Sequence, residues 1–470
     1  MSTIGIELRI GSEDTGATVV TAEFSAFYTF NIQVENQPSQ RILLNQFLKS
    51  LRTLRLNPTA TALDLLALAC AAYAADTKIN RYKNSDDGWT RQFHLFVPVH
   101  NPALWEPHQS LVTHILNFLT GDLWRVTFRQ SAASIVIRRR KLKPSEYHTD
   151  TVCLFSGGMD SFIGAMKLLD EGKRPLLVGH AKSSEVSDFR NQAADALKKR
   201  YTTLDPKLIN AFVRVEKVYD GEEDPIEGEN TERGRSFLFL ALGVVCASGL
   251  PYSETGSSRR SLYIPENGFI TLNIPLTPLR IGAYSTRTTH PYYLGVMQQL
   301  VNAIDLKIDI INPFEFKTKG EMLMESQDPE FVTSVNTMSC SRPATRNAKL
   351  EGKGKRHCGR CVPCLIRCAA LHAAKVSDDN RTLPEERKYR TDIFHERLHA
   401  STRNVDNKSA KGEHVMAFRY MIERNRQNPN YLKAAIHLTG PLDEPAQSLA
   451  VYLRGLKEVE AILENVEVVD

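Results

Sequence analysis

The sequence predicts an α/β protein: a doubly wound parallel sheet, preceded by an N-terminal α+β domain and followed by a helical C-terminal region. Two observations predict this fold class. From residue 150 onward, apolar runs that resemble strands alternate with helix-like segments, an order that is typical of parallel sheets. Between the first of these strands and the first helix stands a glycine-rich turn, Ser156-Gly-Gly-Met-Asp-Ser161. The chain has 470 residues, which is enough for two or three domains.

The first predicted domain covers residues 1–145 and mixes strands with helices. Alternating polarity predicts strands at 5–9, 18–24, 27–34, 93–99 and 134–140, and helical periodicity predicts helices at 42–54, 60–75 and 108–119. The basic run Arg138-Arg-Arg-Lys-Leu-Lys143 ends this domain, and we interpret it as a solvated linker.

The second predicted domain covers residues 146–377 and carries the doubly wound sheet. It begins with strands at 151–155, 175–179 and 208–215 and helices at 162–169 and 188–199. Residues 378–470 form the polar, helical C-terminal region. Within it, 447–464 repeats apolar residues along one helix face, and we expect this face to pack on the core rather than to form a dimer contact.

Composition and charge narrow the classes of function. The net charge of +5 is too small to indicate nucleic acid by itself, and we expect neither nucleic acid nor a membrane as partner. No segment has the roughly 18 apolar residues that cross a bilayer, and the nearest, 60–75, contains Asp64. The N-terminus lacks the features of a signal peptide. We therefore expect a cytoplasmic protein, in which a local group of cysteines indicates metal rather than disulfides.

The glycine-rich turn predicts an anion-binding site. Unpaired N–H groups and the helix dipole converge where a strand, a glycine turn and a helix N-terminus meet. The glycines let a phosphate approach the backbone, and the two serine hydroxyls add donors. The predicted nucleotide-binding residues of the turn are Ser156, Gly157, Gly158, Asp160 and Ser161. In the alternative interpretation, the stretch is a structural turn that Asp160 or Ser161 caps.

Two other nucleotide-binding motifs are missing from the sequence. The kinase and GTPase string G-x-x-x-x-G-K-[ST] does not occur, and the nearest stretch, Gly11-Ser-Glu-Asp-Thr-Gly16, lacks the lysine. The dinucleotide string G-x-G-x-x-G does not occur either. The turn instead resembles the PP-loop of the adenine-nucleotide α-hydrolase-like ATP pyrophosphatases. This resemblance implies a loop that holds the β- and γ-phosphates of ATP while an oxygen nucleophile attacks the α-phosphate.

Four cysteines have the spacing of a metal site. Cys358, Cys361 and Cys364 follow one another at C-x-x-C-x-x-C spacing, and Cys340 lies upstream. Such spacing lets one knuckle direct its thiolates at a tetrahedral ion, and four thiolates without a further cluster motif favour zinc over an iron–sulfur cluster. Cys368 is an alternative fourth ligand. His357 is expected to be a neighbour of the metal rather than a ligand.

The PP-loop, a downstream Ser339-Cys340 and the string H-C-G-x-C-x-x-C together resemble the QueC family, the 7-cyano-7-deazaguanine synthases. The match covers residues 150–374 and includes the segments 156–161, 232–240 and 316–322. The resemblance implies activation of the carboxylate of 7-carboxy-7-deazaguanine by ATP, which forms an acyl-adenylate. An amine nitrogen then displaces AMP. It also implies Mg²⁺ on the phosphates and a structural Zn²⁺.

Several departures point to a particular branch of this family. The family's asparagine near 236 is a serine here, its aspartate-tyrosine-glycine-glutamine is replaced by residues 178–181, and its substrate loop is replaced by 264–268 and 285–291. The first domain has no counterpart in the short enzymes. These traits resemble the long QueC-like proteins of anti-phage operons, the QatC branch of the Qat system or the related branch of type IV CBASS. That resemblance implies transfer of the deazaguanine to an amine of a partner protein from the same operon.

Three basic or acidic residues are predicted to act on the phosphates and the reaction. Asp160 of the loop is a catalytic candidate, which we expect at an exposed helix N-terminus. Arg235 and Lys319 are the other two catalytic candidates, and Arg233 is a candidate for nucleotide binding. The alternatives are a solvated arginine pair and a surface lysine.

Four further residues are predicted to bind the substrate. One carboxylate can accept the neighbouring N1–H and N2–H₂ donors of a guanine-like base, so Glu266 is a candidate with Asn267 beside it. Arg287 and His290 are candidates for the substrate carboxylate or the attacking amine. Their alternatives are a simple turn at Asn267 and a solvated loop.

Two other functions remain open at this point. One is an ordinary 7-cyano-7-deazaguanine synthase that uses ammonia. The other is a nucleotide-sensing or nucleic-acid-binding module with a non-catalytic loop.

Overall fold

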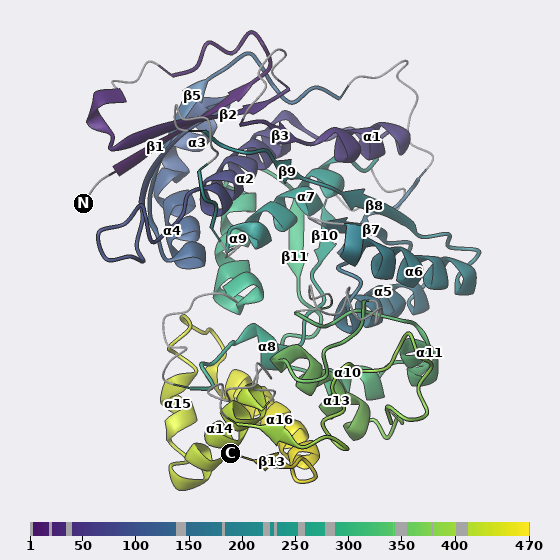
Figure 1. Ribbon diagram of the computed structural model, residues 1–470. Helices are drawn as coiled ribbons and strands as arrows, with labels where there is room; N and C mark the ends of the chain where they lie inside the picture. Colours follow the sequence, from purple (N-terminus) through teal and green to yellow (C-terminus); the bar gives the residue numbers. More distant parts are fainter. Residues whose placement is uncertain are drawn as a thin grey trace.

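The computed structural model has an α/β fold with two parallel sheets and a helical C-terminal region, so the predicted fold class is confirmed (Figure 1). The structure describes residues 3–17, 21–33, 40–137, 147–180, 184–219, 226–229, 233–251, 259–277, 287–341, 343, 355–377, 379–400 and 412–469. The predicted basic linker at 138–143 lies outside these residues.

The N-terminal sheet has four strands in the order β2-β1-β4-β5, and neighbouring strands are parallel. The strands are β1 (Thr3–Ile10), β2 (Ala26–Ile32), β4 (Gln92–Val99) and β5 (Leu123–Gln130). The helices of this domain are α1 (Asn45–Thr53), α2 (Ala60–Lys78), α3 (Pro102–Trp105) and α4 (Gln109–Thr120). Because its strands are parallel and joined through helices, this domain is also α/β, where an α+β mixture was expected.

Two of the five strands expected in the first domain differ from the structure. Within 18–24, the described residues Thr21–Glu23 form one short 3₁₀ turn, η1, and within 134–140 the described residues are not in a strand. Strand β5 was not predicted, although Trp124, Val126 and Phe128 alternate with exposed or half-buried residues along it.

The second sheet has the order β11-β10-β6-β7-β8 with all neighbours parallel. Its strands are β6 (Thr151–Leu154), β7 (Leu176–His180), β8 (Lys207–Ala211), β10 (Arg260–Tyr263) and β11 (Ile308–Ile311). The chain builds β6, β7 and β8 outward, then returns to add β10 on the other side of β6. Ligands of such sheets bind at the carboxyl ends of the strands where the order reverses, which here is between β6 and β10.

Helices cover both faces of this second sheet. α5 (Met159–Asp170) and α6 (Ser184–Arg200) pack on one face, and α7 (Arg235–Gly249) and α9 (Pro291–Ala303) pack on the other. The α7 face shares one continuous apolar core with the N-terminal domain, in which α2 lies along α7. Within the described chain, α2 alone is long and apolar enough to cross a membrane, but 89% of its apolar window is buried in the fold. It is a buried helix of the core.

The C-terminal region forms a separate apolar core below the second sheet (Figure 1). The remaining elements are β3 (Ile42–Leu43), η2 (Glu106–His108), β9 (Arg214–Val215), α8 (Gly268–Thr271), η4 (Arg287–Thr289), α10 (Lys319–Met324), α11 (Pro329–Ser334), α13 (Val362–Ala373), β12 (Leu398–His399), α14 (Glu413–Gln427), α15 (Tyr431–Ala435), α16 (Pro445–Leu463) and β13 (Val468–Val469). The predicted helix at 447–464 is α16, and the residues expected along its apolar face are Leu449, Leu453, Leu456, Val459 and Leu463. Of these, Leu456, Val459 and Leu463 are buried in this core, so the expectation of core packing is confirmed.

Candidate functional site

The glycine-rich loop lies at the carboxyl end of β6 and leads directly into α5. Gly157 has a left-handed φ of 87°, and a Cβ on it would lie 2.8 Å from the Cα of Arg190. Only glycine satisfies both constraints at this position. The Ser161 hydroxyl accepts from Gly157 N at 3.2 Å, and Ser156 Oγ accepts from Gly158 N at 3.3 Å. The serine hydroxyls therefore shape the loop around the start of the helix.

The N-cap of α5 is Gly158, which contributes no side-chain hydrogen bond. Asp160 and Ser161 lie inside the first turn of the helix, so neither is the cap that the structural-turn alternative requires. A glycine cap leaves the N-terminal N–H groups of α5 without a side-chain acceptor from the cap. The positive end of the helix dipole is directed at the same point. This arrangement is suited to binding an anion.

Asp160 joins three segments of the second domain in one buried group. Its Oδ1 lies 2.9 Å from the Nζ of Lys319, and its Oδ2 accepts from Asn267 Nδ2 at 2.7 Å. Glu266 also hydrogen-bonds to it. The structure thus brings together four residues that were predicted for catalysis and substrate binding. The expected exposure of Asp160 is wrong, because α10 and the turn after β10 pack over it and leave it 6% exposed.

The pKa values of the two carboxyl groups in this cluster are shifted in opposite directions. Burial alone would raise the pKa of Asp160, but Lys319 and the hydrogen bonds from Glu266 and Asn267 keep that pKa below its usual value. Burial and the neighbouring Asp160 charge raise the pKa of Glu266 well above its usual value. Asp160 therefore favours its ionised form, and Glu266 favours its protonated form. In that state Glu266 cannot accept two donors from a base, and it would have to release its proton to do so.

Asn267 has a structural task in this arrangement. Its Oδ1 accepts from Ile270 N at 3.1 Å and caps α8, while its Nδ2 donates to Asp160. The side chain is fully buried. Asn267 therefore fixes the turn after β10 to the loop after β6, across the point where the strand order reverses.

Lys319 is held in place by the C-terminal helix α16. It is the first residue of α10, whose N-cap Thr318 forms a capping box with Glu321. Thr318 Oγ1 donates to the carboxylate of Glu458 in α16, and Gly320 N donates to the same carboxylate at 3.3 Å. This carboxylate lies at the positive end of α10, where an anion is stabilising. The C-terminal region thereby sets the position of the lysine that pairs with Asp160.

Two arginines, Arg190 and Arg235, lie at the carboxyl end of β7; we call them the cation pair. Arg190 comes from α6, is 1% exposed, and passes over Gly179, where an added Cβ would lie 2.3 Å from its Cδ. Its Nε donates to Asn210 Oδ1 at 2.6 Å, while its Nη1 has no hydrogen-bond partner among the described residues. Arg235 Nη2 donates to the carbonyl of His180 at 3.4 Å.

The electrostatics of the cation pair favour an anionic ligand. Burial and the charge of Arg235 lower the pKa of Arg190 to about 10. Burial and the two arginines lower the pKa of His180 to about 3, so this imidazole is neutral. Within the described residues, no carboxylate is among the groups that shift the pKa of Arg190. Buried charges are normally paired, and a buried cation without an acid is a candidate to pair with a ligand. Arg190 was not predicted from the sequence.

Three predicted site residues have their contacts elsewhere. Arg233 Nη1 donates to Thr120 O at 2.8 Å, and its guanidinium lies 4.5 Å from the ring of Trp89. Arg287 Nη1 donates to Phe118 O at 2.9 Å. His290 is fully buried, caps α9, and lies 3.3 Å from Thr439 Oγ1. These three side chains connect the domains. These hydrogen bonds and ring contacts are with N-terminal residues, α9 and Thr439, and none of them is with the loop.

The four predicted cysteines form one buried cluster. All four Sγ atoms lie within 4.8 Å of one another, and the Cys340–Cys361 and Cys358–Cys364 separations are both 3.9 Å. A tetrahedral zinc with Zn–S bonds of about 2.3 Å needs S–S separations of about 3.8 Å, so the geometry fits zinc. Cys368 packs instead in the C-terminal apolar core and is not part of the cluster.

Hydrogen bonds within the cluster shift the pKa values of its thiols in both directions, raising those of Cys340 and Cys364 and lowering those of Cys358 and Cys361. Hydrogen bonds from Cys340 and Cys364 lower the pKa of Cys358 to about 6, and hydrogen bonds from Cys340, Cys358 and Cys364 lower the pKa of Cys361 further. Thiolates are the form that binds a metal.

The cysteine cluster is attached directly to the glycine-rich loop. Met338 N donates to Gly157 O at 2.8 Å, and Met159 N donates to Ser339 Oγ at 3.4 Å. Ser339 N in turn donates to His357 Nε2 at 3.2 Å. A metal that fixes Cys340 would therefore also fix the backbone that supports the loop.

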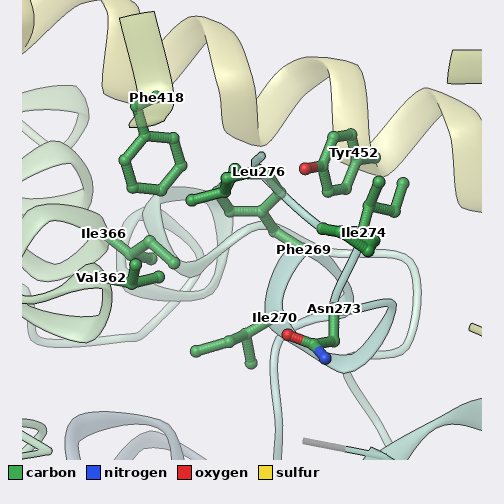
Figure 2. Close-up of a pocket in the computed structure, with 10 residues that line it drawn as sticks. Phe269, Ile270, Asn273, Ile274, Leu276, Val362, Ile366, Phe418 and Tyr452 are labelled. Carbon is green, nitrogen blue, oxygen red and sulfur yellow. The ribbon is translucent and has the colours of Figure 1, made fainter. Parts of the chain in front are cut away.

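A small apolar pocket lies between α8 and the C-terminal helices (Figure 2). Its volume is about 50 Å³, and Phe269, Ile366, Phe418 and Tyr452 are among its lining residues. Ligand pockets typically have volumes of roughly 300–1,000 Å³. This pocket is a packing feature of the C-terminal core and is too small for a purine-like base.

Comparison with known proteins adds no relative. No protein-family model matches the chain, and no curated protein matches it. The assignment to the QueC family therefore remains a prediction from the motifs.

Proposed function

We propose that the protein activates a 7-deazaguanine carboxylate with ATP and transfers the acyl group to an amine of a partner protein. The observation that carries this proposal is the loop after β6, with the N-terminus of α5 and the cation pair at neighbouring carboxyl ends of the sheet. We further propose that this chemistry serves anti-phage defence in the cytoplasm. Both of these points depend on the resemblance to the long QueC-like branch.

The proposed reaction has two balanced steps. A carboxylate oxygen of the deazaguanine attacks the α-phosphorus of ATP, a new P–O bond forms, and the bond to the β-phosphate breaks to release pyrophosphate. The amine nitrogen then attacks the acyl carbon, the bond to AMP breaks, and the amine loses one proton. Both steps bring anions together, so the main task of the protein is to position them and offset their repulsion.

Named residues are suited to these tasks. The N-terminal N–H groups of α5 and the loop backbone can bind the β- and γ-phosphates. Arg190 and Arg235 offset negative charge beside them. Asp160 can supply a carboxylate oxygen of the kind that Mg²⁺ prefers, and Glu266 can do so once it releases its proton; a bound Mg²⁺ would neutralise phosphate charge. Lys319 balances Asp160 until the metal and nucleotide bind.

Nucleotide cleavage is the direct test. The purified protein, ATP, Mg²⁺ and 7-carboxy-7-deazaguanine should yield AMP and pyrophosphate, quantified by ion-exchange chromatography. Asp160→Asn, which keeps the shape of the side chain, should abolish this release. Because the variant leaves Lys319 buried without its acid, its folding must be checked by circular dichroism. Ser12→Ala in the unrelated glycine-containing loop after β1 is the matched control and should cleave at the wild-type rate.

The products decide between the candidate functions. Mass spectrometry of operon partners incubated with the complete reaction should show a gain of one deazaguanine acyl group. Abundant free 7-cyano-7-deazaguanine with unmodified partners would instead indicate the ordinary synthase. A folded wild-type protein that binds ATP without releasing pyrophosphate would indicate a nucleotide-sensing module.

A further inference from the structure

A groove at the carboxyl end of the N-terminal sheet has no role in the proposed chemistry. Its volume is about 890 Å³. One wall consists of residues that follow β1 and β2 and of the segment around Ser134 that crosses the end of the sheet. The other wall consists of β3 and the first turns of α1. We call it the basic groove. Parallel sheets commonly bind their ligands at this end.

The charge of the basic groove has one sign. Arg41, Lys49 and Arg52 line it, and no carboxylate does so among its described lining residues. Lys49 and Arg52 are exposed and lie one turn apart on α1. Arg41 is half-exposed and pairs with Glu216, which is outside the lining, at 2.8 and 3.1 Å. The groove therefore presents positive charge to a partner.

The floor and rims of the groove suit a peptide. Ile42, Leu44 and Leu48 form an apolar floor, and polar residues such as Gln33 and Ser134 face the cations from the other wall. The cations lie at the exposed rim, whereas a small anion is usually held by buried donors. No aromatic residue is present in the described lining, and single-stranded nucleic acids rely on aromatic side chains for stacking. An extended acidic peptide matches both the floor and the charge.

The groove adjoins the second sheet through a short ribbon. β3 in its wall pairs with β9, with Ile42 opposite Val215 and Leu43 opposite Arg214. β9 follows β8, where Asn210 holds Arg190 of the cation pair. Figure 1 shows β3 and β9 between the two sheets. A peptide bound in the groove would lie next to the carboxyl ends of the strands in the second sheet.

We propose that the basic groove docks an acidic segment of the partner protein. This inference rests on the proposed function only where it takes that partner to be the acceptor of the acyl group. Binding to the groove can be measured without ATP or the deazaguanine, so its failure is distinguishable from failure of the chemistry.

The test uses fluorescence anisotropy with the full chain. The probe is a fluorescein-labelled peptide in which Asp and Glu alternate with Ala, and the comparison peptide carries Asn and Gln instead. The wild-type protein should bind the acidic peptide on the order of tenfold more tightly, and this preference should fall as salt rises. The variant Lys49→Glu with Arg52→Glu should lose that preference. Lys433→Glu with Lys457→Glu, which reverses two exposed charges on C-terminal helices, is the control and should keep it.

Hydrogen exchange gives a second readout. The acidic peptide should protect residues 41–52 in the wild-type protein. The proposal is overturned if both peptides bind equally, if the control loses as much affinity as the groove variant, or if protection appears elsewhere. Tighter binding of a single-stranded oligonucleotide than of the acidic peptide would also overturn it.

Discussion

The N-terminal domain and the carboxyl end of β7 each contain a pair of arginines, and the two pairs differ in their partners. In the N-terminal domain, Arg91 lies 2.9 Å from Asp76 and 2.7 Å from Asp122, and Arg81 lies 2.7 Å from Asp122. We call these four residues the acid-paired cluster; the buried Arg233 lies beside it, and the charges of all four residues act on its pKa. At the end of β7, the cation pair of Arg190 and Arg235 has an amide, a carbonyl and a neutral imidazole beside it. Arg190 is as buried as Arg91, at 1% and 0% exposed, but among the described residues no carboxylate shifts its pKa.

The difference in partners indicates a structural role for the acid-paired cluster and a binding role for the cation pair. A buried ion pair with all its hydrogen bonds fixes the geometry of the elements that it joins. The acid-paired cluster does this for the start of α7, because Asp76 Oδ2 accepts from Gly234 N at 2.8 Å. Arg235 is the next residue. The acid-paired cluster therefore positions the start of α7, and with it Arg235.

The largest expected effect concerns the cysteine cluster, which supports the loop beside the cation pair. Structural zinc contributes roughly 10–16 kcal/mol of apparent binding energy in small zinc domains. Cys361→Ser should remove the metal and unfold the region around α13, measured by metal analysis and by thermal unfolding. Cys368→Ser on the same helix is the matched control and should keep one zinc per chain. A stable Cys361→Ser protein with full metal content would show that the cluster is not a structural zinc site.

The second prediction breaks the balance of the acid-paired cluster. Asp122→Asn keeps the size of the side chain but leaves Arg81 and Arg91 with one acid, Asp76. Breaking a buried pair typically costs about 3–5 kcal/mol, so the free energy of unfolding in urea should fall by this amount.

The exposed acid Asp195 offers a control for that measurement. Asp195→Asn should change the free energy of unfolding by less than about 0.5 kcal/mol. If the two variants were equally stable, the acid-paired cluster would have no special structural role.

The third prediction removes a cation that has no acid. Arg190→Gln should lower the free energy of unfolding by less than Asp122→Asn does, because it leaves no buried charge without its partner. It should weaken the binding of a non-hydrolysable ATP analogue roughly 10- to 150-fold, since a charge-assisted hydrogen bond contributes about 1.5–3 kcal/mol. Isothermal titration calorimetry measures this. Arg200→Gln at the end of the same helix should bind as the wild type does. Unchanged affinity in a folded Arg190→Gln protein would remove the cation pair from the nucleotide site.

Several parts of this arrangement that the sequence predicted are local in the chain. The loop from Ser156 to Ser161 and the knuckle from Cys358 to Cys364 are local, so residue spacing alone fixes their geometry. Helix α16 was also predicted, because its apolar period is local. In each case neighbours in the chain are neighbours in the fold.

The site residues and contacts that the sequence did not predict depend on tertiary packing. Arg190 is an ordinary residue of an amphipathic helix in the sequence, and only the packing of α6 on Gly157 and Gly179 places it beside the loop. Arg233 is separated from Arg235 by one residue, yet it faces the N-terminal domain. Its neighbours there, Thr120 and Trp89, are far away in the sequence. No local pattern contains this information.

The smallest expected effect concerns the protonation of His180, which lies beside the cation pair. His180 has a pKa of about 3 in the folded protein, below its ordinary value of 6.5. The unfolded chain therefore binds a proton on this residue as the pH falls below about 6.5, while the folded protein does not. The stabilising contribution of the neutral imidazole is present above that pH. It is lost progressively as the pH falls towards 3.

The variant His180→Gln separates the pH dependence of stability that His180 contributes from that of the other buried histidines. The wild-type free energy of unfolding should fall by roughly 1 kcal/mol more than that of His180→Gln between about pH 6 and pH 5, because one proton corresponds to about 1.4 kcal/mol per pH unit. Urea unfolding at both pH values measures the difference. A saturating ATP analogue should shrink it, since phosphate beside Arg190 and Arg235 would let the imidazole accept a proton in the folded state. Equal pH dependence of the two proteins without ligand would mean that burial and the two arginines do not lower the pKa of His180, and that the imidazole beside the cation pair is not held neutral.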